Sequence, residues 1–106
     1  MIDPTIWELI IKFNDKYFPG WKDREIIYYS NAIAGEAGEI CGIAKKMCGG
    51  GTHFDKEEPN LLEECWDVLI YMVVMLQSQG YIYSDFEQAF FDKLEVLYKR
   101  MEERGG

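Results

Sequence analysis

Apolar side chains recur every three to four residues along the start of the chain, which is the spacing of one face of an α-helix. Asp3-Pro4 has the pattern of an N-cap followed by proline at the first helical position, and Pro19-Gly20 ends the periodic stretch. We therefore expect a first helix between these two signals. Its apolar face consists of Ile6, Trp7, Ile10, Ile11, Phe13 and Tyr17.

Two longer helices and one loop are predicted in the middle of the chain. A helix over about Arg24 to Met47 ends in basic residues followed by three glycines, as helix C-termini often do. The glycines and the charged residues after them predict a loop over Gly49 to Pro59. A third helix is expected from Pro59-Asn60 to about Gln79, with Gly80 as its stop.

A fourth helix is predicted near the end of the chain. Ser84-Asp85-Phe86-Glu87 has the capping-box pattern of a serine followed three residues later by a glutamate. Apolar residues then recur at threes and fours, at Phe86, Phe90, Leu94 and Leu97. We find no convincing β-strand, and Glu25 to Tyr29 is the one β-leaning run.

The length of 106 residues leaves room for one domain with one hydrophobic core. Four helices with short connections favour a single all-α domain over residues 1–106, arranged as a four-helix bundle. Such short helices, rich in Tyr, Phe and Trp, can hardly bury all their apolar faces within one chain. We therefore expect a homodimer or a homotetramer.

Two pairs of carboxylates stand three residues apart, Glu36 with Glu39 and Glu64 with Asp67. That spacing puts both members of a pair on the same helix face. If the second and third helices pack antiparallel, the two pairs can face each other and form an oxygen-only cage, which suits Mg²⁺ or Mn²⁺. A di-iron site would need a histidine three residues after a glutamate, and the single histidine, His53, falls in the predicted loop.

The surroundings of these acids are unusual for a solvated helix face. No basic residue occurs from Glu25 to Ala44, although like charges three residues apart destabilise a helix unless something neutralises them. Gly35 and Gly38 each lower helix propensity by roughly 1 kcal/mol against alanine, which suggests that something approaches the backbone closely there. The alternative is that both pairs are ordinary solvated acids.

The motif Glu-x-x-Glu, followed after 24 residues by Glu-x-x-Asp, resembles the signature of the MazG-like, all-α nucleoside triphosphate pyrophosphohydrolases. The segments Ala34 to Ile40 and Leu62 to Tyr71 carry the likeness, which spans roughly Ile26 to Arg100. The resemblance implies an oligomeric helical bundle that uses Mg²⁺ to hydrolyse a nucleoside triphosphate between its α and β phosphates. The catalytic and metal-binding residues that it implies are Glu36, Glu39, Glu64 and Asp67.

The chain departs from the family pattern at two positions. Trp66 stands where the family often has a small residue before the aspartate. The fourth helix of the family often carries Lys-x-x-x-Asn-x-x-Arg, and this chain matches it with Lys93 and Arg100 but has Leu97 at the asparagine position. That difference affects contacts with the base or ribose more than the metal site.

Lys46, Lys93 and Arg100 are the candidates for substrate binding. Lys46 follows Glu39 by seven residues, so it lies roughly on the same helix face and could reach a phosphate; a solvated lysine favoured by the helix dipole is the alternative. Glu63 could be a metal ligand, the general base or a solvated neighbour of the acids.

The net charge of −8 argues against binding a nucleic-acid polymer or an anionic membrane surface, because no basic stripe is present. A small anionic substrate would need metal cations to mediate its contact. The longest apolar run, Val68 to Leu76, is far shorter than a membrane span of roughly 20 residues, and Met1 to Gly20 resembles neither a signal nor a transit peptide. Three cysteines without a Cys-x-x-Cys pair predict free thiols in a reducing cytoplasm.

The sequence therefore predicts a magnesium-dependent nucleoside triphosphate pyrophosphohydrolase, with Mn²⁺ as a substitute for Mg²⁺. A role in nucleotide-pool house-cleaning is implied by the family resemblance alone. Two alternatives stay open. One is cleavage of phosphoribosyl-ATP by the same kind of site, and the other is a non-catalytic helical module for dimerisation or partner binding.

Overall fold

The computed structural model describes residues 4–49 and 54–105. Within these ranges the chain forms four α-helices and one short 3-10 helix, and no strand. The elements are α1 (Pro4–Tyr17), η1 (Pro19–Asp23), α2 (Ile26–Gly49), α3 (Phe54–Ser78) and α4 (Tyr83–Gly105). The all-α prediction is confirmed, and the β-leaning run is helical from Ile26. None of the helices in the described part of the chain has the length and apolar character needed to cross a membrane.

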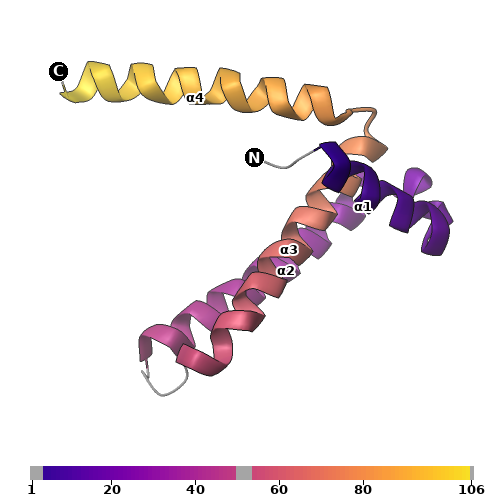
Figure 1. Ribbon diagram of the computed structural model, residues 1–106, viewed down its shortest axis with the longest axis horizontal. Helices are drawn as coiled ribbons and strands as arrows, with labels where there is room; N and C mark the ends of the chain where they lie inside the picture. The colour runs from indigo at the N-terminus through magenta and orange to yellow at the C-terminus, as the bar shows by residue number, and fades with distance from the viewer. Residues whose placement is uncertain (1–3, 50–53, 106) are drawn as a thin grey trace.

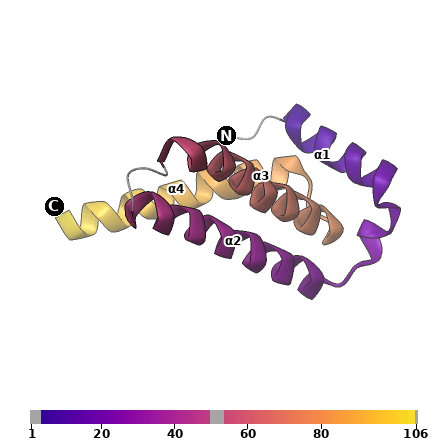
Figure 2. The same cartoon turned by 90° about the horizontal axis from the view of Figure 1, so that it is seen from below.

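Helices α2 and α3 form an antiparallel hairpin, which makes the most extensive packing contact in the structure. Figures 1 and 2 show the two helices side by side along their lengths. Helix α1 and η1 pack on α3 near the end of the hairpin where α2 begins and α3 ends. The antiparallel arrangement expected for the second and third helices is therefore present.

The hydrophobic core lies at this same end of the hairpin. Its tryptophans also satisfy their ring N–H groups: Trp7 Nε1 donates to Gln77 Oε1 at 2.6 Å, and Trp21 Nε1 donates to Asp15 Oδ1 at 2.8 Å. The Tyr29 hydroxyl donates to the Trp21 carbonyl oxygen, which ties the start of α2 to η1. The buried apolar side chains are Trp7, Trp21, Tyr29, Val73 and Val74.

The end of α3 is fixed by Gly80, as the sequence predicts. Gly80 has φ +93°, and its N–H donates to the Gln77 carbonyl oxygen while the Tyr81 N–H donates to that of Leu76. These two bonds make a Schellman motif, in which the left-handed residue is ordinarily glycine. The next helix therefore leaves in a new direction.

The capping of α4 differs from the prediction. The Asp85 carboxylate accepts a hydrogen bond at 3.0 Å from the Ile82 N–H, so Asp85, rather than Glu87, returns to cap the helix. Glu87 instead accepts a hydrogen bond from the Tyr83 hydroxyl at 3.1 Å. Helix α4 therefore begins at Tyr83, one residue before the serine expected to cap it.

The start of α3 also differs from the prediction, since it begins at Phe54 rather than near Pro59. The charged residues before the proline favour helix as readily as loop, because lysine and glutamate are good helix formers. The predicted loop is accordingly shorter, and the glycines at 50 and 51 and His53 lie outside the described residues. At the other end of the chain, α1 begins at Pro4 as expected, whereas its predicted cap, Asp3, also lies outside them.

The four helices do not close into a bundle within one chain, which corrects the predicted architecture. Figure 1 shows α4 leaving the hairpin at an open angle, and its described residues pack extensively on none of the other helices. Its first turns touch α1, where the Trp7 ring meets the rings of Tyr83 and Phe86. The apolar residues of α4 beyond this contact stay exposed, since the turn at Gly80 directs the helix away from the hairpin.

Candidate metal centre

The antiparallel hairpin brings Glu36 of α2 opposite Glu64 and Asp67 of α3. One carboxylate oxygen from each of these three residues lies within 4.8 Å of the other two. Two oxygens on opposite sides of one Mg²⁺ are about 4.2 Å apart, since each Mg–O bond is about 2.1 Å. A small side-chain movement would therefore let all three residues share one ion.

Glu64 lies at the centre of this group. Its Oε2 atom is buried and receives no hydrogen bond from the residues that the structure describes. The neighbouring Glu36 and Glu39 are carboxylates as well, so a hydrogen bond among them requires a proton on one of them. Hydrogen bonding with Glu36, then with Glu39, followed by burial and by repulsion from both charges, raises the pKa of Glu64 to about 7. Near neutral pH the cluster thus holds a proton or attracts a cation.

Three of the four predicted metal ligands converge, and the fourth lies beside them. Glu39 interacts with Glu64 but is not one of the three residues whose oxygens meet. Glu63, the alternative candidate on α3, is exposed and is likewise outside this group. The candidate centre therefore consists of Glu36, Glu64 and Asp67, with Glu39 as a neighbour.

The charge of the centre is not balanced by basic side chains. In the described ranges no lysine or arginine forms an ion pair with these acids; the ion pair present, between Lys99 and Glu95 at 3.5 Å, lies exposed on α4. Repulsion among unpaired, half-buried carboxylates destabilises a fold unless a proton or a cation relieves it. The centre thus has the donor chemistry of a hard-cation site.

The three predicted substrate-binding residues are not gathered at this centre. Lys93 and Arg100 are exposed on α4, which does not pack on the hairpin, so one chain does not bring them to the acids. A role of Lys93 and Arg100 in substrate binding therefore stays a prediction. Lys46 is exposed in the last turn of α2, which agrees with the solvated alternative.

The glycines at positions 35, 38 and 42 of α2 have open space beside them in the described part of the chain. A Cβ atom built on Gly35, Gly38 or Gly42 would meet no atom from another part of residues 4–49 and 54–105 within 4 Å. The expectation of a close approach is therefore wrong for the isolated chain. The three glycines instead form an open strip on α2, where the backbone itself is accessible.

A cavity of about 360 Å³ adjoins the acidic centre, and Asp67 belongs to both. Burial raises the pKa of Tyr71 above its usual range, and the nearby Tyr28, Glu36 and Asp67 raise it further while Arg24 lowers it. The Tyr71 side chain is therefore close to the acids as well as to the cavity. The other lining residues are Phe13, Asn14, Phe18, Arg24, Tyr28, Tyr29, Ile70 and Val74.

The sequence indicated little of this cavity. Trp7 and Trp21 are buried in the core and do not line the cavity. Phe18 does line the cavity, whereas Asn14, Arg24 and Tyr28 gave no signal because they come from different elements without a shared spacing. The comparisons add no further guide, because no family model, curated protein or solved structure matches this chain.

Proposed function

We propose that this protein is a metal-dependent hydrolase that cleaves a nucleoside triphosphate into the monophosphate and pyrophosphate. The observation that carries the proposal is the convergence of Glu36, Glu64 and Asp67 within 4.8 Å, with no ion pair to a basic side chain among the described residues. The aromatic cavity beside Asp67 supports the same function, since it offers a place for the rest of the nucleotide. The likeness to the MazG-like motif agrees with this choice.

The residues fit a hard divalent cation. Glu36, Glu64 and Asp67 would hold it, and a rotation of the Glu39 side chain would add a fourth carboxylate. A bound Mg²⁺ or Mn²⁺ would neutralise the phosphates and lower the pKa of a coordinated water. The proposed activity requires such a cation, because a chain with a net charge of −8 repels a polyphosphate that arrives without cations.

The residues of the centre then have two tasks during hydrolysis. They hold the reacting groups in line, and a carboxylate accepts the proton of the attacking water. The water oxygen bonds to phosphorus, the bridge between the α and β phosphates breaks, and pyrophosphate leaves. The exposed Glu63 is a second candidate for the proton acceptor. Glu63→Gln should lose activity if Glu63 accepts the proton, and should keep it if a carboxylate of the centre does.

The proposal includes a second copy of the chain. The accessible surface of the chain is 7878 Å², whereas a compact monomer of 12.4 kDa exposes about 6,100 Å². Its radius of gyration is 17.0 Å, against about 13 Å for a compact domain of this length. The excess of about 1,700 Å² per chain is twice the roughly 800 Å² that each partner buries in a standard interface.

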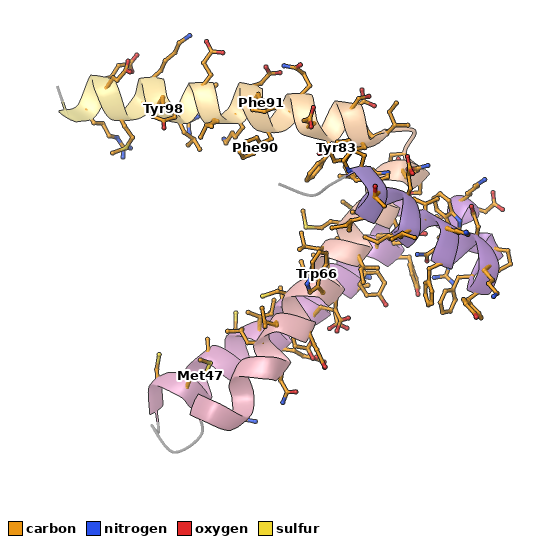
Figure 3. All side chains as sticks on the ribbon, in the orientation of Figure 1. Met47, Trp66, Tyr83, Phe90, Phe91 and Tyr98 are labelled. Atoms are coloured by element: carbon orange, nitrogen blue, oxygen red, sulfur yellow. The ribbon has the colours of Figure 1, made fainter. Side chains whose placement is uncertain are left out.

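The open angle between α4 and the hairpin is the surface that a second copy would cover. Figure 3 shows Phe90 and Tyr83 on the side of α4 that faces the hairpin, which carries Trp66. Phe90 and Trp66 are both exposed within one chain. The open glycine strip of α2 would also accept a close helix of a partner. A homodimer, or a dimer of dimers, would bury these surfaces.

A metal-dependent assay of product release tests the proposed activity. The protein is incubated with each of the common nucleoside triphosphates and with Mg²⁺, Mn²⁺ or a chelator, and both pyrophosphate and orthophosphate are measured. We expect pyrophosphate only, and only with metal. Glu36→Gln and Asp67→Asn should abolish its release, whereas Glu8→Gln, an exposed acid on α1, should not.

Two results of this assay would redirect the proposal. Release of orthophosphate with a diphosphate left over would refute the cleavage between the α and β phosphates. If no triphosphate is cleaved, phosphoribosyl-ATP is the next substrate to test, and failure with that compound too would favour a partner-binding module.

A further inference from the structure

Arg24 is the one basic side chain among the described residues that line the cavity beside the acidic centre. It is half-buried, and its guanidinium lies 4.4 Å from the centroid of the Tyr28 ring. Stacking of this kind occupies a face of the planar guanidinium and leaves the N–H groups at its edge available to a ligand. Within the described ranges Arg24 forms no ion pair with a carboxylate, so the cavity contains a positive charge that is not neutralised there.

The backbone is anchored on both sides of Arg24. Trp21 of η1 and Tyr29 of α2 are buried, and the Tyr29 hydroxyl donates to the Trp21 carbonyl oxygen. Arg24 lies between these two residues with an extended backbone, φ −74° and ψ 142°, at the junction where η1 ends and α2 begins. Because the junction is held at two points, the guanidinium is positioned at the cavity before a ligand arrives, which reduces the entropy lost on binding.

The cavity relates this positive charge to the acidic centre. Arg24 and Asp67 line the same cavity, and Asp67 also belongs to the centre. Burial raises the pKa of Tyr71, the charges of Glu36 and Asp67 raise it further, and the charge of Arg24 lowers it. The Tyr71 side chain is therefore within electrostatic reach of both the acids and the guanidinium. A ligand in the cavity would lie close to a metal ion held by the acids and to the N–H groups of Arg24.

We propose that Arg24 is a substrate-binding residue whose guanidinium pairs with the phosphate chain of the nucleotide. The inference rests on the proposed function and identifies the basic side chain that acts together with the metal. A nucleobase also presents acceptors to a guanidinium, but a neutral acceptor forms a hydrogen bond about half as strong as that of an anionic phosphate oxygen. The fork of N–H donors also matches two oxygens of one phosphate. In a chain with a net charge of −8, this local positive charge favours an anionic ligand.

Binding of a whole substrate analogue and of its two halves tests this inference. The probes are the tightest-binding α,β-methylene analogue of the common nucleoside triphosphates, its nucleoside, and inorganic tripolyphosphate, each titrated calorimetrically in the presence of Mg²⁺. Arg24→Gln should weaken binding of the analogue and of tripolyphosphate by about tenfold, the lower end of the range for a hydrogen bond to a charged group, because Arg24 is half-buried. The affinity for the nucleoside should change by less than about twofold, since it carries no phosphate.

Lys22→Gln is the matched control for Arg24→Gln. Lys22 also stacks on an aromatic ring, with its Nζ 5.5 Å from the centroid of the Trp21 ring, but it does not line the cavity. Both substitutions remove one positive charge, so a loss of affinity confined to Arg24→Gln does not come from the net charge of the chain. Arg24→Lys keeps the charge and loses the fork of donors, so its affinity should lie between those of the wild type and Arg24→Gln. Thermal melts show whether each variant is folded.

The outcomes distinguish this inference from the proposed function. If Arg24→Gln weakens the nucleoside as much as the analogue, Arg24 acts on the base or on the aromatic wall, and the phosphate contact is refuted. The phosphate contact is also refuted if tripolyphosphate does not bind the wild type, if Arg24→Gln leaves its binding unchanged, or if Lys22→Gln causes an equal loss. In all these cases pyrophosphate release by the wild type still supports the hydrolase proposal. If the wild type neither binds an analogue nor releases pyrophosphate under any metal condition, the proposed function itself fails.

Discussion

Magnesium binding should release a proton from Glu64 at mildly acidic pH. The carboxyl has a pKa of about 7 in the metal-free fold, so it is about 90% protonated at pH 6 and about 10% protonated at pH 8. Since a metal ligand must be deprotonated, binding should release about 0.9 proton at pH 6 and about 0.1 at pH 8. Because a proton and Mg²⁺ compete for the Glu64 carboxylate, the apparent affinity for Mg²⁺ should be about tenfold weaker at pH 6 than at pH 8.

Isothermal titration calorimetry measures this proton release directly. Titrations with Mg²⁺ in two buffers of different ionisation enthalpy, at each pH, give the number of protons transferred to the buffer. Glu64→Gln has no proton to lose at this position, so its release should be close to zero at both pH values. Glu8→Gln should behave like the wild type. A release that does not depend on pH, or an unchanged release in Glu64→Gln, would refute the reasoning.

The same pKa sets the sign of the pH dependence of stability. The carboxyl of Glu64 titrates near 4.5 when unfolded and near 7 in the metal-free fold, so the native state binds the proton more tightly. The contribution of Glu64 to the stability of the fold is therefore complete below about pH 4.5 and is lost as the pH rises through 7. Between pH 5 and pH 8, thermal melts of the metal-free wild type should show a steeper fall in stability than melts of Glu64→Gln.

Three further predictions follow from the cluster, the turn and the open surface. Without metal, Glu39→Gln or Asp67→Asn should melt at the same temperature as the wild type or higher, because repulsion among the carboxylates falls; a lower melting temperature would contradict this. Mg²⁺ at 100 times its dissociation constant should stabilise the wild type by about 2.7 kcal/mol and these variants by much less. Gly80→Ala should destabilise the fold by roughly 1 kcal/mol in a denaturant titration because of its positive φ, while Gly20→Ala, in open space, should be nearly neutral. Light scattering at tens of micromolar should show wild-type dimers or tetramers and a shift toward monomer in Leu97→Glu; a monomeric wild type would disprove the oligomer.

Local signals in the sequence were sufficient to predict most of the helices. Pro4 and Gly80 mark boundaries correctly because each acts through its own backbone, by a fixed φ or by tolerance of a positive one. The predictions were wrong where more than one residue could cap a helix, or where the same residues could form either a helix or a loop. Asp85 rather than Glu87 caps α4, and the charged residues before Pro59 continue a helix that composition had suggested was a loop.

The relative placement of the helices was less accessible than their existence. The pattern along α4 shows that one of its faces is apolar, but it does not indicate whether the same chain or another covers that face. The acidic residues were found because a spacing of three residues recurs on two adjacent helices. The cavity was missed because Asn14, Arg24 and Tyr71 come from different elements and meet only after α1 and η1 pack on the hairpin.

The isolation of α4 also has consequences for folding and hydrogen exchange. Helices α2 and α3 are close in sequence and make the main contact, so the hairpin can form early at a small loop-closure cost. Helix α4 gains little from the rest of its own chain, and its amides should therefore exchange with solvent far faster than those around Val73 and Val74 when the protein is dilute. Protection of α4 should rise with protein concentration, so the last helix would become ordered in step with assembly.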